Sequence, residues 1–178
     1  MDGLFMGAWD ELDTQISVNV DTSDIHNASS RLDDFFTAEI AEYLEDLEEA
    51  VEEGSRQGIS DLATRNRSFQ QQIINDVCDN PSGMLASSIQ EEEQDEYTYL
   101  IGTIINEIYP MSIEYGRGPV YPIRARALAF YAPTGELVFR MSAGPSKPRP
   151  FVAPAFDRTL DIAENIMLEY VGGAVDKC

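Results

Sequence analysis

The residues that most often carry catalysis or bind metals are scarce in this sequence. Histidine occurs once, as His26, and cysteine twice, as Cys78 and Cys178. Two cysteines are too few for a disulfide framework, and neither they nor any serine stand in a nucleophile motif. Zinc-protease, phosphate-loop and calcium-loop motifs are also missing. We therefore expect no catalytic residue, no cofactor and no metal ion, and we interpret His26 as a surface or helix-cap histidine.

Lysine and long apolar runs are equally scarce. Lys147 and Lys177 are the only lysines. The first residues lack a cationic leader followed by an apolar run, and no segment approaches the ~20 apolar residues of a membrane span. The sequence therefore predicts neither a signal peptide nor a membrane partner.

Negative charge is what the chain has in excess. It contains 32 Asp and Glu against 12 Lys and Arg, a formal net charge of -20. Repulsion on this scale destabilises a compact fold in dilute buffer, and molar salt screens it over a few ångströms. We therefore expect a source that lives in, or infects hosts with, a cytoplasm of molar salt. The acidity also allows an alternative, a protein that mimics the charge of DNA.

Positive charge is concentrated in one segment. Between Tyr115 and Leu160 the chain has seven Lys or Arg against two acids, so this segment is about +5 and the rest about -25. A basic segment punctuated by glycine and proline in an acidic chain indicates two surfaces with different partners, as ring-forming proteins need. The predicted interface residues are Tyr115, Gly116, Arg117, Arg124, Arg126, Arg140, Lys147, Arg149, Pro150 and Phe151.

The cations of this segment have two interpretations. They pair with carboxylates of the same chain or of a neighbouring subunit, or they contact DNA in a channel. Arginine suits planar pairing with a carboxylate, so the preference for Arg over Lys favours the first interpretation.

Helical periodicity is longest over residues 30–63, where Ser30 and Asp33 resemble a capping box. Two glycines in that stretch, Gly54 and Gly58, either mark a break or allow close packing against a sheet. A second helix is predicted over residues 68–77. The apolar stripe of the first comprises Phe36, Ile40, Leu44, Leu47, Val51, Gly54, Gly58 and Leu62.

A closing helix is predicted over residues 151–171, with Pro150 in its first turn. Residues 172–178 are expected to form a flexible tail. The predicted core side of the helix comprises Phe156, Leu160, Ile166, Met167 and Val171.

Alternation of apolar and polar residues predicts several short strands. One covers residues 15–21. A hairpin covers residues 89–93 and 97–105, and a second hairpin covers residues 126–131 and 136–141 around a Pro-Thr-Gly turn. A short helix is predicted between the hairpins, over residues 105–115. The three successive glutamates at 91–93 are interpreted as a solvated strand, because successive strand residues point to opposite faces.

These elements predict the α+β class. We expect a single domain over residues 29–171, in which a small antiparallel sheet packs against a long helix of the N-terminal half and a C-terminal helix. Residues 1–28 are expected to form an arm that contains the short strand. Its apolar side chains are expected to dock on a neighbouring subunit rather than fray, and they are Leu4, Phe5, Met6 and Trp9.

Four pieces of the chain, taken in order, carry a family resemblance. They are Ser82 to Ile89 (SGMLASSI), Glu114 to Pro119 (EYGRGP), the hairpin around the Pro-Thr-Gly turn, and Lys147 to Asp157 (KPRPFVAPAFD). Their order and spacing resemble the tail-completion, or neck, proteins of tailed double-stranded DNA viruses. The resemblance covers residues 80–170. Upstream, only a generic long helix matches, and the extreme acidity is not a trait of that family.

The resemblance implies a structural role without enzymatic activity. It implies a hexameric ring in the virion neck, between a head-side adaptor or connector protein and a tail terminator or tail tube protein. Genomic DNA would pass through the ring without sequence-specific binding, and assembly would occur in the host cytoplasm. The acidic helix would face outward or line the channel. The alternative is an acidic DNA-mimicking inhibitor of a host DNA-binding factor, and a metal-dependent hydrolase ranks last because ligands are missing.

Overall fold

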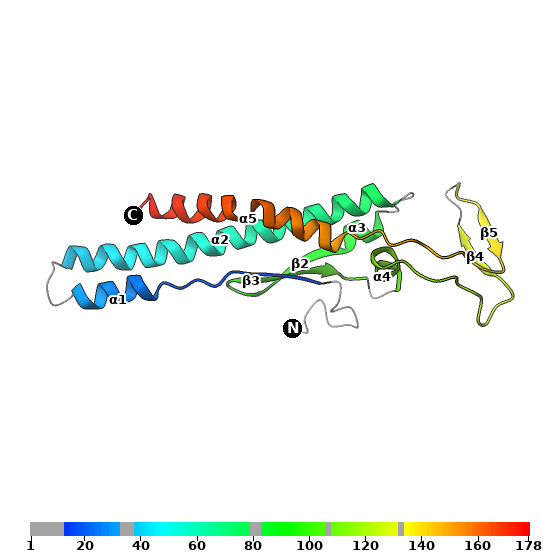
Figure 1. Ribbon diagram of the computed structural model, residues 1–178, viewed down its shortest axis with the longest axis horizontal. Helices are drawn as coiled ribbons and strands as arrows, with labels where there is room; N and C mark the ends of the chain where they lie inside the picture. The colour runs from blue at the N-terminus through cyan, green and yellow to red at the C-terminus, as the bar shows by residue number, and fades with distance from the viewer. Residues whose placement is uncertain (1–12, 33–37, 79–82, 106–107, 132–133) are drawn as a thin grey trace.

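The computed structural model describes residues 13–32, 38–78, 83–105, 108–131 and 134–178. It confirms the predicted α+β class. A 40-residue helix, α2 (Ala38–Val77), runs along the long axis of the molecule and packs antiparallel to the C-terminal helix α5 (Val152–Val175) (Figure 1). A small antiparallel sheet lies against α2, and a separate two-stranded hairpin lies at one end of the molecule.

α2 is one continuous helix, so the prediction of two helices separated at residues 64–67 is wrong. The polar stretch that suggested a break carries Asn66, which is fully buried and donates a hydrogen bond to Thr159 of α5 at 3.0 Å. Gln70, one turn later, is also buried and donates to Asn66 at 2.9 Å. The buried stripe therefore continues from Ile59 to Ile74 with two polar members joined by a hydrogen bond.

The chain before α2 differs from the prediction. Residues 23–32 form a separate helix, α1 (Ser23–Leu32), which the sequence patterns did not predict. Ser30 lies inside α1 rather than at the start of the long helix, so the predicted capping box is wrong. Phe36 and the apolar residues of the predicted arm lie outside the described residues.

Gly54 and Gly58 allow two helices to approach closely, and the partner is α5 rather than the sheet. A Cβ atom at Gly54 would lie 2.8 Å from Cα of Val171, and one at Gly58 would lie 2.7 Å from the sulfur of Met167. α2 is unbroken at both positions. The glycines therefore set the distance between the two long helices.

The three-stranded sheet has the order β1-β3-β2. β1 (Thr14–Ser17) is shorter than predicted and pairs antiparallel with β3 (Thr98–Thr103). The predicted first hairpin is confirmed as β2 (Ile89–Asp95) and β3. A one-and-a-half-turn helix, α3 (Met84–Ser88), leads directly into β2. Buried isoleucines from all three strands meet α2, and they are Ile16, Ile89 and Ile101.

The predicted core side of α5 is confirmed at Ile166, which is buried, and at Met167, which packs against the core, but it is wrong at Leu160, and the helix ends later than predicted. Leu160 is 57% exposed, whereas Ala155 and Thr159 are buried, because small and polar side chains face α2 where Asn66 reaches across. The helix continues four residues beyond Val171 to Val175, and neither glycine at 172–173 has the positive φ of a helix-ending glycine.

We expect Gly54→Ala to lower the free energy of unfolding by roughly 1–3 kcal/mol, because the added methyl group meets the backbone of α5. The matched control is Gly173→Ala on α5, where a Cβ would meet nothing within 4 Å. The control should raise stability by about 0.5–1 kcal/mol, because alanine is the better helix former. Denaturant unfolding at fixed salt measures both; equal effects of the two substitutions would contradict this account of the helix contact.

Candidate interaction site

The predicted second hairpin stands apart from the rest of the molecule. β4 (Leu128–Tyr131) and β5 (Leu137–Arg140) pair with each other, and they lie at the opposite end from the C-terminus (Figure 1). Two isolated bridges, Arg117 with Ser146 and Val120 with Ala143, join the chain segments that lead to it. We call residues 116–148 the hairpin module and the two bridged segments its stalk. α4 (Ile108–Glu114) precedes the stalk and confirms the short helix predicted there.

The hairpin module has no core of its own. None of its described residues is buried. Large apolar side chains are exposed instead, with Ile123 at 97%, Tyr131 at 74% and Met141 at 71%. A two-stranded hairpin with no hydrophobic face covered is marginally stable in water. A concentration of exposed apolar side chains is typical of interaction surfaces.

Five of the predicted interface cations lie on the hairpin module. Arg124, Arg126, Arg140 and Lys147 are exposed and Arg117 is half-buried. Among the described residues, none of the five forms an ion pair with a carboxylate. The positive charge of the five cations is therefore not neutralised by carboxylates in the described part of the chain, and it is available to a partner.

Two of the predicted interface residues serve the fold instead. Phe151 is 1% exposed and belongs to the main core, so its assignment to an interface is corrected. Arg149 is half-buried, and its Nη1 donates a hydrogen bond to the carbonyl of Val77, the last residue of α2, at 3.0 Å. A cation at that place satisfies an end carbonyl and suits the negative end of the helix dipole.

Glu114 is the residue that the sequence interpretation missed. It is 7% exposed, and its Oε2 accepts hydrogen bonds from the backbone N–H groups of Phe151 at 2.7 Å and Val152 at 3.3 Å. Those groups begin α5, and Phe151 at the cap position has no capping side chain. The carboxylate of Glu114 thus replaces a local cap and lies at the positive end of the α5 dipole.

The beginning of the stalk requires a glycine. Gly116 has φ of +73°, and a Cβ there would lie 2.7 Å from the carbonyl oxygen of Ser146. The next residue, Arg117, exchanges two backbone hydrogen bonds with Ser146, at 3.1 and 3.0 Å. Tyr115 is 54% exposed beside them. Pro150 precedes the helix cap, so Pro154, and not Pro150 as predicted, lies in the first turn of α5.

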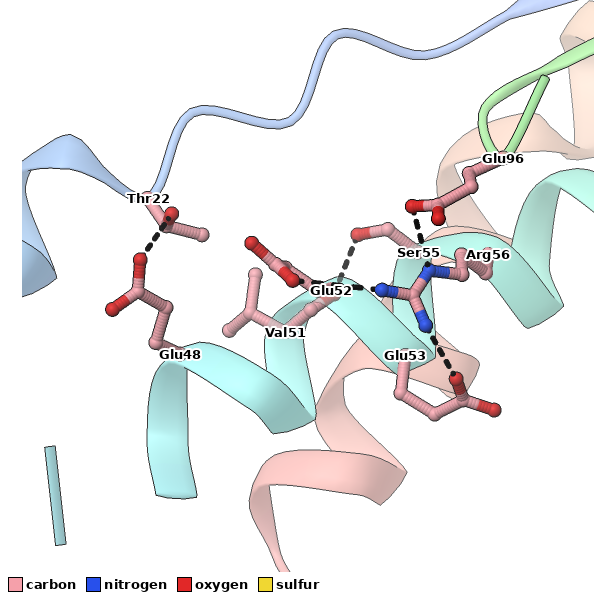
Figure 2. A network of polar contacts seen from close by, with 8 residues as sticks. All are labelled: Thr22, Glu48, Val51, Glu52, Glu53, Ser55, Arg56 and Glu96. Carbon is pink, nitrogen blue, oxygen red and sulfur yellow. Dashed lines mark hydrogen bonds and ion pairs between the residues drawn. The ribbon is translucent and has the colours of Figure 1, made fainter. Parts of the chain in front are cut away.

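The opposite end of the molecule is strongly acidic. Between Glu42 and Glu53, α2 carries seven Asp or Glu and no Lys or Arg, and we call this stretch the acidic face. Its members repeat at three- and four-residue steps, where like charges on a helix repel one another. Figure 2 shows where that repulsion is partly relieved. Arg56 lies 3.2 Å from Glu53, 3.6 Å from Glu52 and 3.4 Å from Glu96 of the β2–β3 turn.

The pKa of Arg56 is raised by a hydrogen bond with Tyr97 and by the nearby charge of Glu96 and Glu53, which keeps its guanidinium charged. In the middle of the acidic face, Glu48 accepts a hydrogen bond from Thr22 at 2.9 Å, and its other oxygen lies 3.7 Å from His26. His26 is exposed.

A groove lies between the acidic face and the last turns of α5. Its acidic members outnumber the two cations, Arg56 and Lys177, and two small residues of α5, Gly173 and Ala174, also line it. We call it the α2–α5 groove. It is lined by Asp46, Glu49, Ala50, Glu52, Glu53, Arg56, Gln57, Glu169, Tyr170, Gly173, Ala174 and Lys177.

Within the described residues, no three His, Cys, Asp or Glu side chains are arranged to hold a metal ion. None of the described helices combines the length and apolar character needed to cross a bilayer. Glu91 of the glutamate run lies 3.5 Å from Arg67 and accepts a hydrogen bond from Thr64. Comparison with known proteins finds no family, no curated protein and no solved structure that matches this chain.

We expect Glu114→Gln to lower the free energy of unfolding by about 1–2 kcal/mol, because the start of α5 loses a charged acceptor. Glu136→Gln is the matched control, since Glu136 is exposed on the hairpin module. The control should lie within about 0.5 kcal/mol of the original protein. Denaturant unfolding measures both, and a neutral effect at Glu114 would show that its carboxylate does not act as the cap.

We expect the melting temperature to rise by several degrees between about 0.1 M and about 3 M salt, because salt screens the repulsion along the acidic face. Removing two of its charges with Glu45→Gln and Glu49→Gln should raise the melting temperature at low salt and reduce the salt dependence. Calorimetry on both proteins measures this. A melting temperature independent of salt would contradict the role given to the repulsion.

Proposed function

We propose that this chain is a structural protein of the neck of a tailed double-stranded DNA virus, one copy of a hexameric ring that joins the head to the tail. The observation that carries the proposal is the division of the molecule into two unlike ends. An acidic helical body lies at one end, and a basic hairpin module with no buried residue among those described lies at the other (Figure 1).

Such an arrangement suits a protein that acts by holding partners at fixed positions. Identical copies that meet through two different patches form rings when the rotation between copies closes. The hairpin module needs a covering surface because a lone hairpin is marginally stable. Further patches would then meet a head-side adaptor or connector protein and a tail terminator or tail tube protein.

The motifs that resemble neck proteins coincide with the construction of the stalk. Glu114, in the EYGRGP segment, holds the start of α5, and Gly116 permits the close contact with Ser146. Phe151, in the closing KPRPFVAPAFD segment, is buried in the core. These residues hold the hairpin module at a defined position on the body. That supports a structural role, in which the protein acts by positioning its partners.

The residues of the acidic face that lie outside the α2–α5 groove, Glu42, Glu45 and Glu48, suit the passage of DNA in the proposed ring. Like charges keep the phosphate backbone from binding, so a duplex can slide past without sequence-specific contacts. A DNA-mimicking inhibitor would use the same acidic face. It would have no use for five cations and an exposed apolar surface at the far end, so the neck protein is the better-supported function.

The proposal is tested on particles. We expect the chain to be found in purified virions, at the head–tail junction. Arg124→Glu with Arg126→Glu should reduce the joining of filled heads to tails by at least about tenfold, because a charge placed against like charge costs several kcal/mol. Stability should change by less than about 1 kcal/mol, since both side chains are exposed.

The matched control is Arg65→Glu with Arg158→Glu, which changes the net charge equally on exposed positions of the body. Arg65 gives up one exposed ion pair with Asp61, which is worth less than about 1 kcal/mol. Joining should then be nearly normal. Virions that lack the chain, or normal joining by the hairpin variant, would refute the proposed function.

A further inference from the structure

The hairpin module and the α2–α5 groove have opposite chemistry. The module carries five cations without an ion pair among the described residues and several exposed aromatic or aliphatic side chains. Three of the carboxylates that line the groove, Asp46, Glu49 and Glu169, form no ion pair with a cation among the described residues. Complementary charge on two exposed surfaces of one chain favours contact between copies.

The two surfaces lie at opposite ends of the molecule, so one copy cannot bring them together. The hairpin module lies beyond the start of α5, whereas the groove lies between the first half of α2 and the last turns of α5 (Figure 1). A contact that joins unlike ends of neighbouring copies repeats from copy to copy. It therefore produces a closed ring or an open filament rather than a two-fold dimer.

We propose that the hairpin module of each copy docks in the α2–α5 groove of the next copy. This inference rests on the proposed ring and names the contact that builds it. Arg124 and Arg126 of the module face the carboxylates of the groove, because a guanidinium pairs with a carboxylate through parallel hydrogen bonds. Exposed apolar side chains of the module, Phe139 and Met141 among them, cover the small residues and Tyr170 of the groove.

The apolar part of this contact matters when salt is high. Molar salt shortens the range of charge attraction to a few ångströms. Pairs in direct contact and buried apolar surface both persist under that condition. The contact can therefore hold in the salt that a chain of formal charge -20 needs, while the long-range repulsion between acidic bodies is screened.

The test swaps charge between the two surfaces. The first variant, Arg124→Glu with Arg126→Glu, has an acidic groove and a module that has lost its net positive charge, with three cations and three acids. The second, Glu49→Lys with Glu169→Lys, has a basic module and a basic groove. Each alone should associate at least about tenfold more weakly than the original chain. An equimolar mixture should recover association, because the basic module of the second variant then meets the acidic groove of the first, and the introduced glutamates meet the introduced lysines.

Sedimentation velocity and native mass spectrometry measure the assemblies, in the lowest salt that leaves the circular dichroism spectrum unchanged. The matched control is Glu42→Lys with Glu164→Lys, two exposed positions outside the groove, and it should associate like the original chain. If either charge-swapped variant alone associates as strongly as the original chain, or if the mixture does not recover association, the proposed contact is wrong.

A second measurement locates the contact directly. Cys178 is exposed, and its sulfur lies 3.5 Å from the carbonyl oxygen of Asp46 at the side of the groove. A photoreactive benzophenone on Cys178, with Cys78→Ser, should cross-link to peptides from residues 116–148 of another copy. Mixing isotopically light and heavy chains identifies links between copies. Cross-links to any other segment would overturn the proposal. So would the absence of cross-links both in solution and in particles that contain the chain.

The two proposals fail separately. If virions contain a ring of this chain and the charge swap has no effect, the neck assignment stands and this contact is wrong. If the swap restores association and virions lack the chain, the contact stands and the neck assignment is wrong. If the module variant loses binding to double-stranded DNA and the mixture recovers nothing, the cations bind DNA and the contact is wrong.

Discussion

The structure depends on two charged groups that end the two long helices where they meet the stalk. Glu114 caps the start of α5 and Arg149 donates to the last carbonyl of α2. Each sits at the helix end whose dipole favours its charge. Both residues flank the hairpin module in sequence, so the same interactions that finish the helices also hold the stalk against the body. The position of an almost unpacked module is thereby fixed by the packed part of the chain.

The contact between α2 and α5 depends on two glycines and a buried polar pair. Gly54 lies against the backbone of α5 and Gly58 against the side chain of Met167, and Asn66 donates a hydrogen bond to Thr159 across the same contact. A buried polar pair of this kind satisfies itself only in one register. The glycines set the separation and the polar pair sets the register. The long body is therefore a defined scaffold for the acidic face and for the groove beside it.

Much of the architecture was predictable from the sequence, because alternation and helical spacing are local. The α+β class and both hairpins follow from such patterns. Three features were not local. The continuity of α2 was missed because the hydrogen-bond partner of the buried Asn66 is on another helix. α1 was missed because it is short and mostly polar, with only Ile25, Ala28 and Leu32 as apolar residues. Glu114 contacts backbone groups 37 residues away. One signal for it existed: α5 begins at Phe151 without a capping residue of its own, so some other acceptor had to supply the cap.

The stalk has a mechanical consequence. The two segments of the stalk are joined to each other by two isolated bridges, and none of the described residues of the hairpin module is buried against the body. Pivoting of the module about its base therefore breaks little packing, whereas shifting it sideways would disturb the capped helix ends. A joint built this way fixes which faces of two molecules meet and leaves the angle between them adjustable. In the ring proposed above, such tolerance would let identical subunits sit between layers whose symmetries do not match.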